Sequence, residues 1–116
     1  MSSIIYKIVA RDIWNRALEK GTFAGAEIDL EDGFIHFSTA AQVRQTAARF
    51  FEGRDSLYLI GVDAEKLGDG LKWEPASNGM LFPHLYGSLP MSAVVSQDEL
   101  LLGPLGSHQF PDGIPA

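Results

Sequence analysis

The stretch that organises this chain is Gly33-Phe34-Ile35-His36-Phe37-Ser38-Thr39. Its apolar residues predict a short strand that leads into a helix, because Thr39 and Gln42 have the spacing of a capping box. The start of a helix exposes unpaired N–H groups and the positive end of the helix dipole. The imidazole of His36 and the hydroxyls of Ser38 and Thr39 therefore form a candidate site for an anion or a nucleotide. The alternative is structural: Thr39 only caps the helix, and His36 is an ordinary half-buried strand residue.

The composition is that of one small domain. A chain of 116 residues can bury a single core without metal or disulfide staples. The absence of cysteine excludes a disulfide framework, a thiolate metal site and a cysteine nucleophile. The net charge of -6 argues against nucleic acid or an anionic membrane as a partner. We find neither a signal-peptide pattern nor the roughly 20 apolar residues of a membrane span, and we expect a cytoplasmic protein.

The order of the elements predicts an α+β domain. Apolar runs and period-two patterns indicate strands within 4–9, 33–39, 57–62, 71–74 and 93–96. Helical spacing predicts helices near 12–20 and 40–52. A strand, helix, strand, helix order followed mostly by strands favours a mixed or antiparallel sheet. We expect one domain over 1–100 and an irregular tail over 101–116, which is rich in proline.

Two amphipathic helices are expected to cover the core. Asp12 is placed to cap the first helix, and Gly21 is placed to end it in the left-handed conformation. The stripes predicted to be buried are Ile13, Trp14, Ala17 and Leu18 in the first helix, and Val43, Ala47, Phe50 and Phe51 in the second.

Lys7 is the odd residue in an otherwise apolar strand. It is either a snorkelling side chain at a sheet edge or a cation directed into a pocket. The loop between Gly21 and Gly33 is acidic, and such a loop is either simply solvated or a lid over a site. Its carboxylates are Glu27, Asp29, Glu31 and Asp32.

A second histidine, His84, lies in an aromatic segment near a turn signal at 77–79 that is typical of antiparallel hairpins. Pro83 beside it argues against a long central strand. His36 and His84 would share a pocket, where histidine can bind a ligand or transfer a proton. Glu74 is the candidate carboxylate, with an exposed strand-end charge as its structural alternative, and Tyr86 is a candidate stacking surface.

Other chemistries have weaker support. Neither histidine has a second ligand at i+2 or i+4, so a metal site is not indicated. Ser38 and Ser88 lie outside any nucleophile-elbow pattern. The chain contains neither a Walker loop nor a GxGxxG motif, which argues against ATPase and Rossmann chemistry.

The chain closely resembles the small bacterial domain-of-unknown-function family 952 (DUF952) from Ile4 to Val95. The paired GFIHxS and FPHxYG patterns are the specific part of the resemblance. The matching residues are Ile5-Tyr6-Lys7-Ile8, Trp14, the stretch 33–39, Gln42-Val43 and Phe82-Pro83-His84-Leu85-Tyr86-Gly87-Ser88-Leu89.

DUF952 has no established activity, but it looks like a distant relative of the ADP-ribosyltransferase fold, with the RNA 2′-phosphotransferases as the closest analogy. On this analogy, Tyr6-Lys7, Ile35-His36-Phe37-Ser38 and Ser77-Asn78-Gly79 match three motifs of those enzymes. The resemblance implies a split, mostly antiparallel sheet with two main helices. It also implies a nucleotide-like or small anionic ligand, with NAD as the candidate cofactor.

One departure concerns Lys7, because the family usually has histidine there, and in ADP-ribosyltransferases that histidine holds the adenosine ribose of NAD. Lysine has no acceptor and cannot copy a neutral imidazole, although it can pair with a phosphate.

The resulting hypothesis is a protein that binds a small molecule and catalyses transfer or hydrolysis at the ribosyl carbon of an NAD-like substrate. The candidate residues then have two roles, catalysis and cofactor binding. Glu74 would stabilise the electron-poor sugar cation of such a reaction. The competing hypothesis is a non-catalytic ligand sensor or interaction module with structural histidines. The candidate catalytic residues are His36, Glu74 and His84, and the candidate cofactor-binding residues are Lys7, Ser38, Thr39 and Tyr86.

Overall fold

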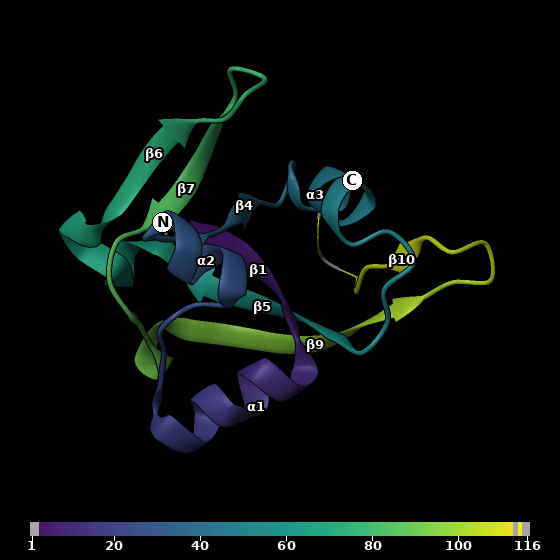
Figure 1. The fold of residues 1–116 in the computed structure, drawn as a ribbon, viewed down its shortest axis with the longest axis horizontal. Coiled ribbons are helices and arrows are strands. Elements are labelled where there is room, and N and C mark those ends of the chain that lie inside the picture. Colours follow the sequence, from purple (N-terminus) through teal and green to yellow (C-terminus); the bar gives the residue numbers. More distant parts are fainter. Residues whose placement is uncertain (1–2, 113, 115–116) are drawn as a thin grey trace.

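The strands form antiparallel sheets that curl around each other, with three α-helices and two 3-10 helices between them among the described residues (Figure 1). The computed structural model describes residues 3–112 and residue 114. The elements in chain order are β1 (Ile4–Ala10), α1 (Arg11–Lys20), β2 (Thr22–Phe23), α2 (Glu27–Asp32), β3 (Ile35–His36), β4 (Ser38–Thr39), α3 (Val43–Phe50), β5 (Leu57–Asp63), η1 (Ala64–Gly70), β6 (Leu71–Pro75), β7 (Leu81–Leu85), β8 (Leu89–Pro90), η2 (Met91–Ala93), β9 (Val94–Leu102) and β10 (His108–Gln109).

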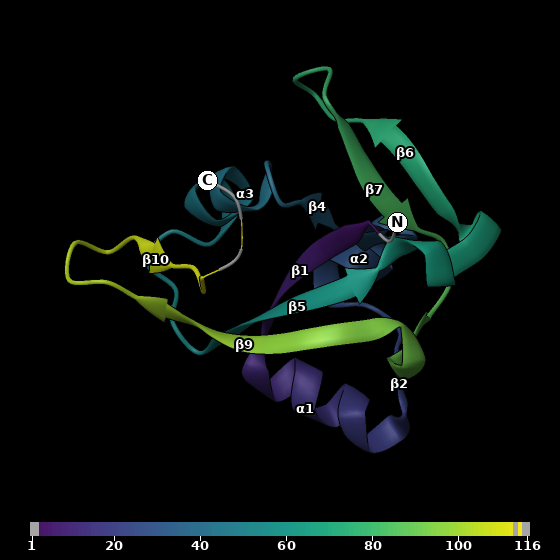
Figure 2. The same ribbon diagram turned by 180° about the vertical axis from the view of Figure 1, so that it is seen from behind.

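The largest sheet is five-stranded, in the order β10-β9-β5-β1-β4, and both of its faces are covered. β5 reads as a nearly continuous apolar run because its side chains point alternately into two buried clusters. One cluster holds Trp14 of α1 with Ile60 and Val62, and the other holds Val43 and Ala47 of α3 with neighbours from β5. α1 and α3 therefore lie on opposite sides of this sheet (Figures 1 and 2).

β1 is paired unequally along its two edges. β5 pairs with it over the whole length from Ile4 to Ala10. β4 on the other side pairs only with Ile5 and Tyr6. In an antiparallel strand, alternate N–H and C=O groups point to each edge, so the edge of β1 beyond Tyr6 presents backbone groups that no strand covers among the described residues.

The chain changes sheets at Phe37. β3, just before it, pairs with β7 in a three-stranded sheet of order β3-β7-β6. β4, just after it, pairs with β1 in the five-stranded sheet. The Phe37 N–H donates to the Pro83 carbonyl at 3.0 Å, which fixes the corner. His36 and Ser38 are thus held by different sheets although only one residue separates them.

The predicted α+β domain with antiparallel sheets is confirmed, as are the left-handed Gly21 (φ 82°) and the buried Trp14. Some helix details were wrong. Ala10 is the N-cap of α1, and Asp12 lies inside the first turn, where its carboxylate accepts from Arg16. Leu18 is 45% exposed because it lies beyond the stripe that faces the sheet.

The second helix also differs from its prediction. α3 begins at Val43, because Thr39 belongs to β4 and residues 40–42 form turns. Phe50 is 65% exposed, whereas Val43 and Ala47 are buried as predicted. The capping-box spacing still has an effect, since Gln42 Oε1 accepts from the Thr39 N–H at 3.0 Å.

Other segments are more ordered than the sequence predicted. The acidic loop contains α2, a helix of six residues. The region expected to be irregular from residue 101 continues β9 to Leu102 and then turns into β10, which pairs back with β9. Pro115 of that region lies outside the described residues. Pro83 is in β7, the middle strand of its sheet, but β3 pairs only with His84 and Leu85, so β6 is the one strand that pairs with β7 at Pro83 among the described residues.

Candidate functional site

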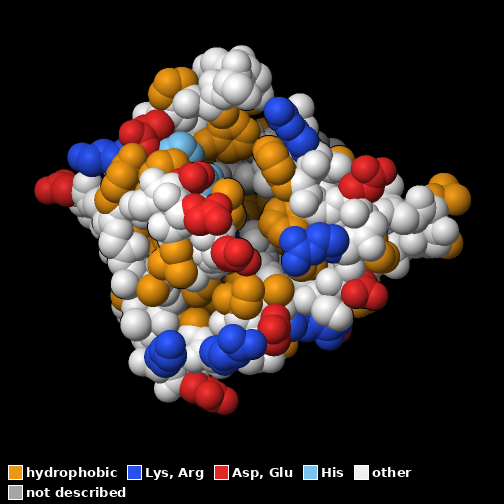
Figure 3. Space-filling view, viewed as in Figure 1, with side chains coloured by type: hydrophobic (Ala, Val, Ile, Leu, Met, Phe, Trp, Pro, Cys, Tyr) orange, Lys and Arg blue, Asp and Glu red, His pale blue; other side chains and the backbone are white. Residues whose placement is uncertain are grey.

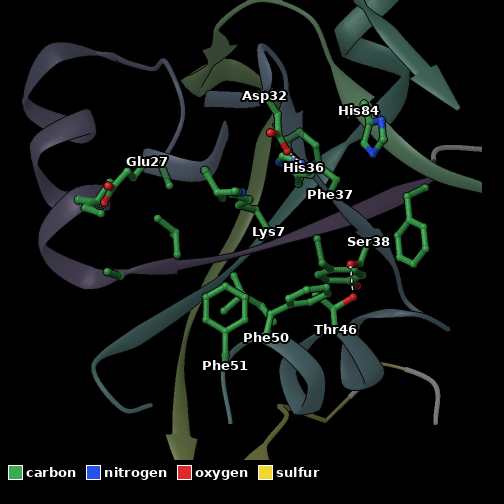
Figure 4. A pocket seen from close by; sticks show the side chains of 18 of the residues that line it. Lys7, Glu27, Asp32, His36, Phe37, Ser38, Thr46, Phe50, Phe51 and His84 are labelled. Atoms are coloured by element: carbon green, nitrogen blue, oxygen red, sulfur yellow. Dashed lines mark hydrogen bonds and ion pairs between the residues drawn. The ribbon is translucent and has the colours of Figure 1, made fainter. Parts of the chain in front are cut away.

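A cleft of about 730 Å³ opens along the free edge of β1, between α2 on one side and α3 on the other. Figure 3 shows this side of the molecule with a hollow near its centre and acidic side chains gathered at its margin. Its polar lining residues are Lys7, Glu27, Glu31, Asp32, His36, Ser38, Thr46, Arg54 and His84, and apolar residues that include Ile8, Phe37, Phe50 and Phe51 complete it (Figure 4).

Asp29 is the centre of a buried polar cluster beside the cleft. Its side chain is fully buried, and both carboxylate oxygens lie within 2.9 Å of the Lys7 ammonium, which is itself only 6% exposed. Asp29 Oδ1 also accepts from the His36 N–H at 3.1 Å and lies 2.7 Å from His36 Nδ1. Asp29 Oδ2 accepts from the Ala26 N–H at 2.8 Å. The carboxylate therefore ties α2 to both β1 and β3.

These contacts determine the charge states of the cluster. Burial raises the pKa of Asp29, but the hydrogen bond from His36 and the charge of Lys7 lower it by more. The net result is a pKa of about 2. Burial lowers the pKa of Lys7, and the attraction of Asp29 offsets part of that decrease. Lys7 is therefore a buried cation compensated by Asp29, and it is not a side chain that extends into open solvent.

Acid is expected to weaken the fold through Asp29. Because the folded-state pKa of about 2 lies below the ordinary value of 3.8, this group stabilises the protein above pH 4 or so and loses that effect as the pH falls toward 2. The shift corresponds to about 2 kcal/mol. Urea unfolding measured from about pH 6 to about pH 2 should show this loss, and Asp29→Asn should flatten the profile. Parallel profiles for the two proteins would contradict the assignment.

His36 is held by two carboxylates. Its Nδ1 faces Asp29, and its Nε2 lies 3.0 Å from Asp32 Oδ2 at the cleft side. Its side chain is one-third exposed, and the Asp32 side chain is 44% exposed. The imidazole is thus fixed at one nitrogen by a buried anion and contacted at the other by an anion that solvent reaches.

His84 lies directly opposite His36 in the β3–β7 pair, with ring centroids 5.5 Å apart. Its Nδ1 is 2.8 Å from Glu74 Oε1, and the Tyr86 hydroxyl donates to the same oxygen at 2.7 Å. A carboxylate accepts, so Nδ1 of His84 carries the proton in this bond. Nε2 of His84 has no hydrogen-bond partner among the described residues, and His84 lines the cleft.

Glu74 and Tyr86 influence each other. The Tyr86 hydroxyl and then His84 hold the pKa of Glu74 below its ordinary value, and the same hydrogen bond to Glu74 raises the pKa of Tyr86. Glu74 is therefore an ionised carboxylate that orients His84. The phenyl ring of Phe34 supports the group: it stacks on His84 with ring centroids 4.1 Å apart and lies 4.6 Å from His36.

Of the remaining predicted site residues, some line the cleft and others lie behind its wall. Ser38 lines the cleft, and its Oγ lies 2.8 Å from Thr46 Oγ1, whose hydroxyl donates to the Gln42 carbonyl. Thr39, Glu74 and Tyr86 are not among the lining residues. The structure thus brings Lys7, Ser38, His36 and His84 to one cleft, with Glu74 and Tyr86 behind His84.

Sequence reasoning missed three residues of the cleft region: Asp29, Asp32 and Arg54. A buried lysine needs a carboxylate, so Lys7 in an apolar strand was a signal for Asp29. Nothing in the sequence distinguished Asp29 from the other acids of its loop. Arg54 lies on the α3 side of the cleft, where its guanidinium contacts the Phe51 ring at 5.2 Å.

No group of three or more potential metal ligands converges within residues 3–112. Within the same part of the chain, no helix is long and apolar enough to cross a membrane.

Comparison with known proteins identifies the family. The sequence profile of DUF952, described as a protein of unknown function, matches residues 8–97. The chain belongs to the DUF952 family. The matched region includes Asp29, His36, Glu74 and His84, whereas Lys7 lies just before its first residue. A search of curated proteins gives no significant match.

Solved DUF952-like structures have the same fold. The crystal structure of protein CC0527 from Caulobacter crescentus is 45% identical, with a TM-score of 0.88 over 92% of this chain and 94% of that chain. The solution NMR structure of CC0527 is also 45% identical, with a TM-score of 0.83 over 91% of each chain. This DUF952 protein and CC0527 therefore share one architecture along nearly their whole length.

Proposed function

We propose that the protein binds a small nucleotide-like, anionic molecule in the cleft and that His84 acts there as a proton acceptor. The observation that carries the proposal is the arrangement of His84: its Nδ1–H donates to Glu74, its Nε2 has no hydrogen-bond partner among the described residues, and His84 lines the cleft. A carboxylate that orients a histidine in this way leaves the second nitrogen basic and directed, which is what general-base chemistry requires.

The shape and lining of the cleft support a nucleotide-sized ligand. Its volume of about 730 Å³ is within the roughly 300–1,000 Å³ typical of small-molecule sites. Phe50 and Phe51 offer apolar surface at one wall for a planar ring, and the free edge of β1 offers backbone donors and acceptors. Arg54 supplies a positive charge on the α3 side, and the His36 ring lines the cleft beside Asp32 of α2.

The finer hypothesis is an ADP-ribosyltransferase-like protein that transfers or hydrolyses at the ribosyl carbon of NAD. The lining residues fit part of NAD, because Arg54 and His36 could bind its diphosphate. Glu74 does not line the cleft, so it would act on an electron-poor sugar only indirectly, by orienting His84. Lys7 would act through Asp29, because its ammonium is already paired. NAD would supply the electrophilic ribosyl carbon, while this chain binds, orients and accepts a proton at His84 Nε2.

The competing function is a non-catalytic ligand sensor. It is favoured by one observation, the full use of His36 in hydrogen bonds to Asp29 and Asp32, which suits a structural histidine. A sensor would bind the same ligands and leave them unchanged, so product analysis separates the two functions.

The test is a ligand-observed NMR screen with NAD, ADP-ribose and AMP, repeated on His84→Gln. We expect binding to the unmodified protein and a Kd at least about tenfold weaker in the variant, as for one lost hydrogen bond in a partly buried site. His108→Gln is the matched control, because His108 is in β10 and its Nε2 donates to the Arg54 carbonyl, a bond that glutamine can keep. The absence of binding, or equal effects of both variants, would contradict the proposal.

A further inference from the structure

We propose that Nε2–H of His36 is the binding point for an oxyanion of the ligand, and that the Asp32 carboxylate occupies this point in the free protein. The inference rests on the proposed function, because it names the ligand group that the same cleft recognises.

The first step is the protonation of His36. Its Nδ1 lies 2.7 Å from Asp29 Oδ1, and its Nε2 lies 3.0 Å from Asp32 Oδ2. An ionised carboxylate can only accept a hydrogen bond. Both ring nitrogens must therefore donate, and His36 is an imidazolium in this arrangement. Nδ1–H is permanently engaged by a buried acceptor, so Nε2–H is the donor that a ligand can reach.

The second step is the difference between the two carboxylates. Asp29 is fully buried and also receives hydrogen bonds from Lys7, the Ala26 N–H and the His36 N–H. Asp32 is the last residue of α2, its side chain is 44% exposed, and its contact with His36 is its only hydrogen bond within the described residues. Rotation of Asp32 into solvent therefore breaks one bond, whereas removal of Asp29 would break four contacts. Asp32 is the displaceable partner.

The third step is the charge balance. Lys7 and Asp29 compensate each other, and His36 and Asp32 do the same across the cleft wall (Figure 4). When Asp32 rotates away, one positive charge on His36 remains for a ligand. A phosphate or carboxylate oxygen would then take the place of the Asp32 oxygen, which already mimics its geometry. This explains how a chain with a net charge of -6 accepts an anion.

The test compares Asp32→Ala with Glu31→Ala, its neighbour on α2. Both acids line the cleft, but only Asp32 contacts His36. We expect Asp32→Ala to bind AMP about tenfold more tightly, the equivalent of one charge-assisted hydrogen bond that no longer has a competitor. Glu31→Ala should gain much less, because a charge that acts through solvent has a small effect. Adenosine, which lacks the phosphate, should bind both variants as it binds the unmodified protein.

Two further probes identify the anion and its place. Inorganic phosphate and acetate, titrated separately, distinguish a phosphate from a carboxylate, and the ring resonances of His36 should shift with the anion that binds. Equal gains in AMP affinity for the two variants, or a gain for adenosine, would overturn the inference while leaving the proposed function intact. Failure of AMP, phosphate and acetate to bind either the unmodified protein or Asp32→Ala would overturn both.

Discussion

Asp29→Asn is expected to destabilise the fold by about 3–5 kcal/mol, the usual result of removing one partner from a buried ion pair. The Lys7 ammonium, 6% exposed, would face an amide instead of a carboxylate. A loss of this size is a large part of the roughly 5–15 kcal/mol that stabilises most domains. The free energy of unfolding in urea at neutral pH measures it.

The control is a double-mutant cycle with Lys7→Met. We expect Lys7→Met alone to cost less than Asp29→Asn, because Asp29 keeps the N–H groups of Ala26 and His36 and the His36 ring as hydrogen-bond partners. The double variant Lys7→Met/Asp29→Asn should recover much of the loss, since no charge of the pair is left buried alone. Additive losses in the cycle would contradict the idea that the two residues act as a pair.

Trp14→Ala is expected to cost about 3–5 kcal/mol, as is typical when a large aromatic side chain is deleted from a core. Trp14 is fully buried, its ring packs 5.4 Å from that of Phe23, and its Nε1–H donates to Gln97 Oε1 at 2.7 Å. The residue therefore joins α1 to β2 and β9, and its loss leaves both a cavity and an unpaired amide. Thermal unfolding followed by circular dichroism measures the effect.

Trp14→Phe separates the two contributions, because it keeps most of the apolar volume and removes only the indole donor. We expect it to retain more than half of the stability that Trp14→Ala loses. A loss as large as that of the alanine variant would assign the effect to the Gln97 hydrogen bond instead of to packing.

The features of the fold that depend on a local sequence pattern could be predicted from the sequence. The apolar run of β5, the turn between β6 and β7 and the helix end at Gly21 each follow from side-chain periodicity or glycine conformation. A pocket shared by His36 and His84 was predicted from two aromatic, histidine-containing segments, and the register of β3 and β7 brings these residues together.

What the sequence could not predict depends on tertiary contacts. α2 has only six residues, mostly acidic, and its N-cap residue is Ala26, so the usual N-terminal signal of a helix was missing. Its position follows from Asp29, which contacts Lys7 in β1 and His36 in β3. Burial of a carboxylate is rare, and composition gives no means of choosing which acid is buried.

The corner at Phe37 has a consequence for how the protein can diversify. Because β3 ends in one sheet and β4 begins in another, the angle between the sheets sets how far His36 and His84 stand from Ser38 and the β1 edge. Substitutions at the corner can therefore alter the width of the cleft while the hydrogen-bonded histidines stay unchanged. Within one fold, the size of the ligand that the cleft accepts can therefore change in evolution independently of the histidines that act on it.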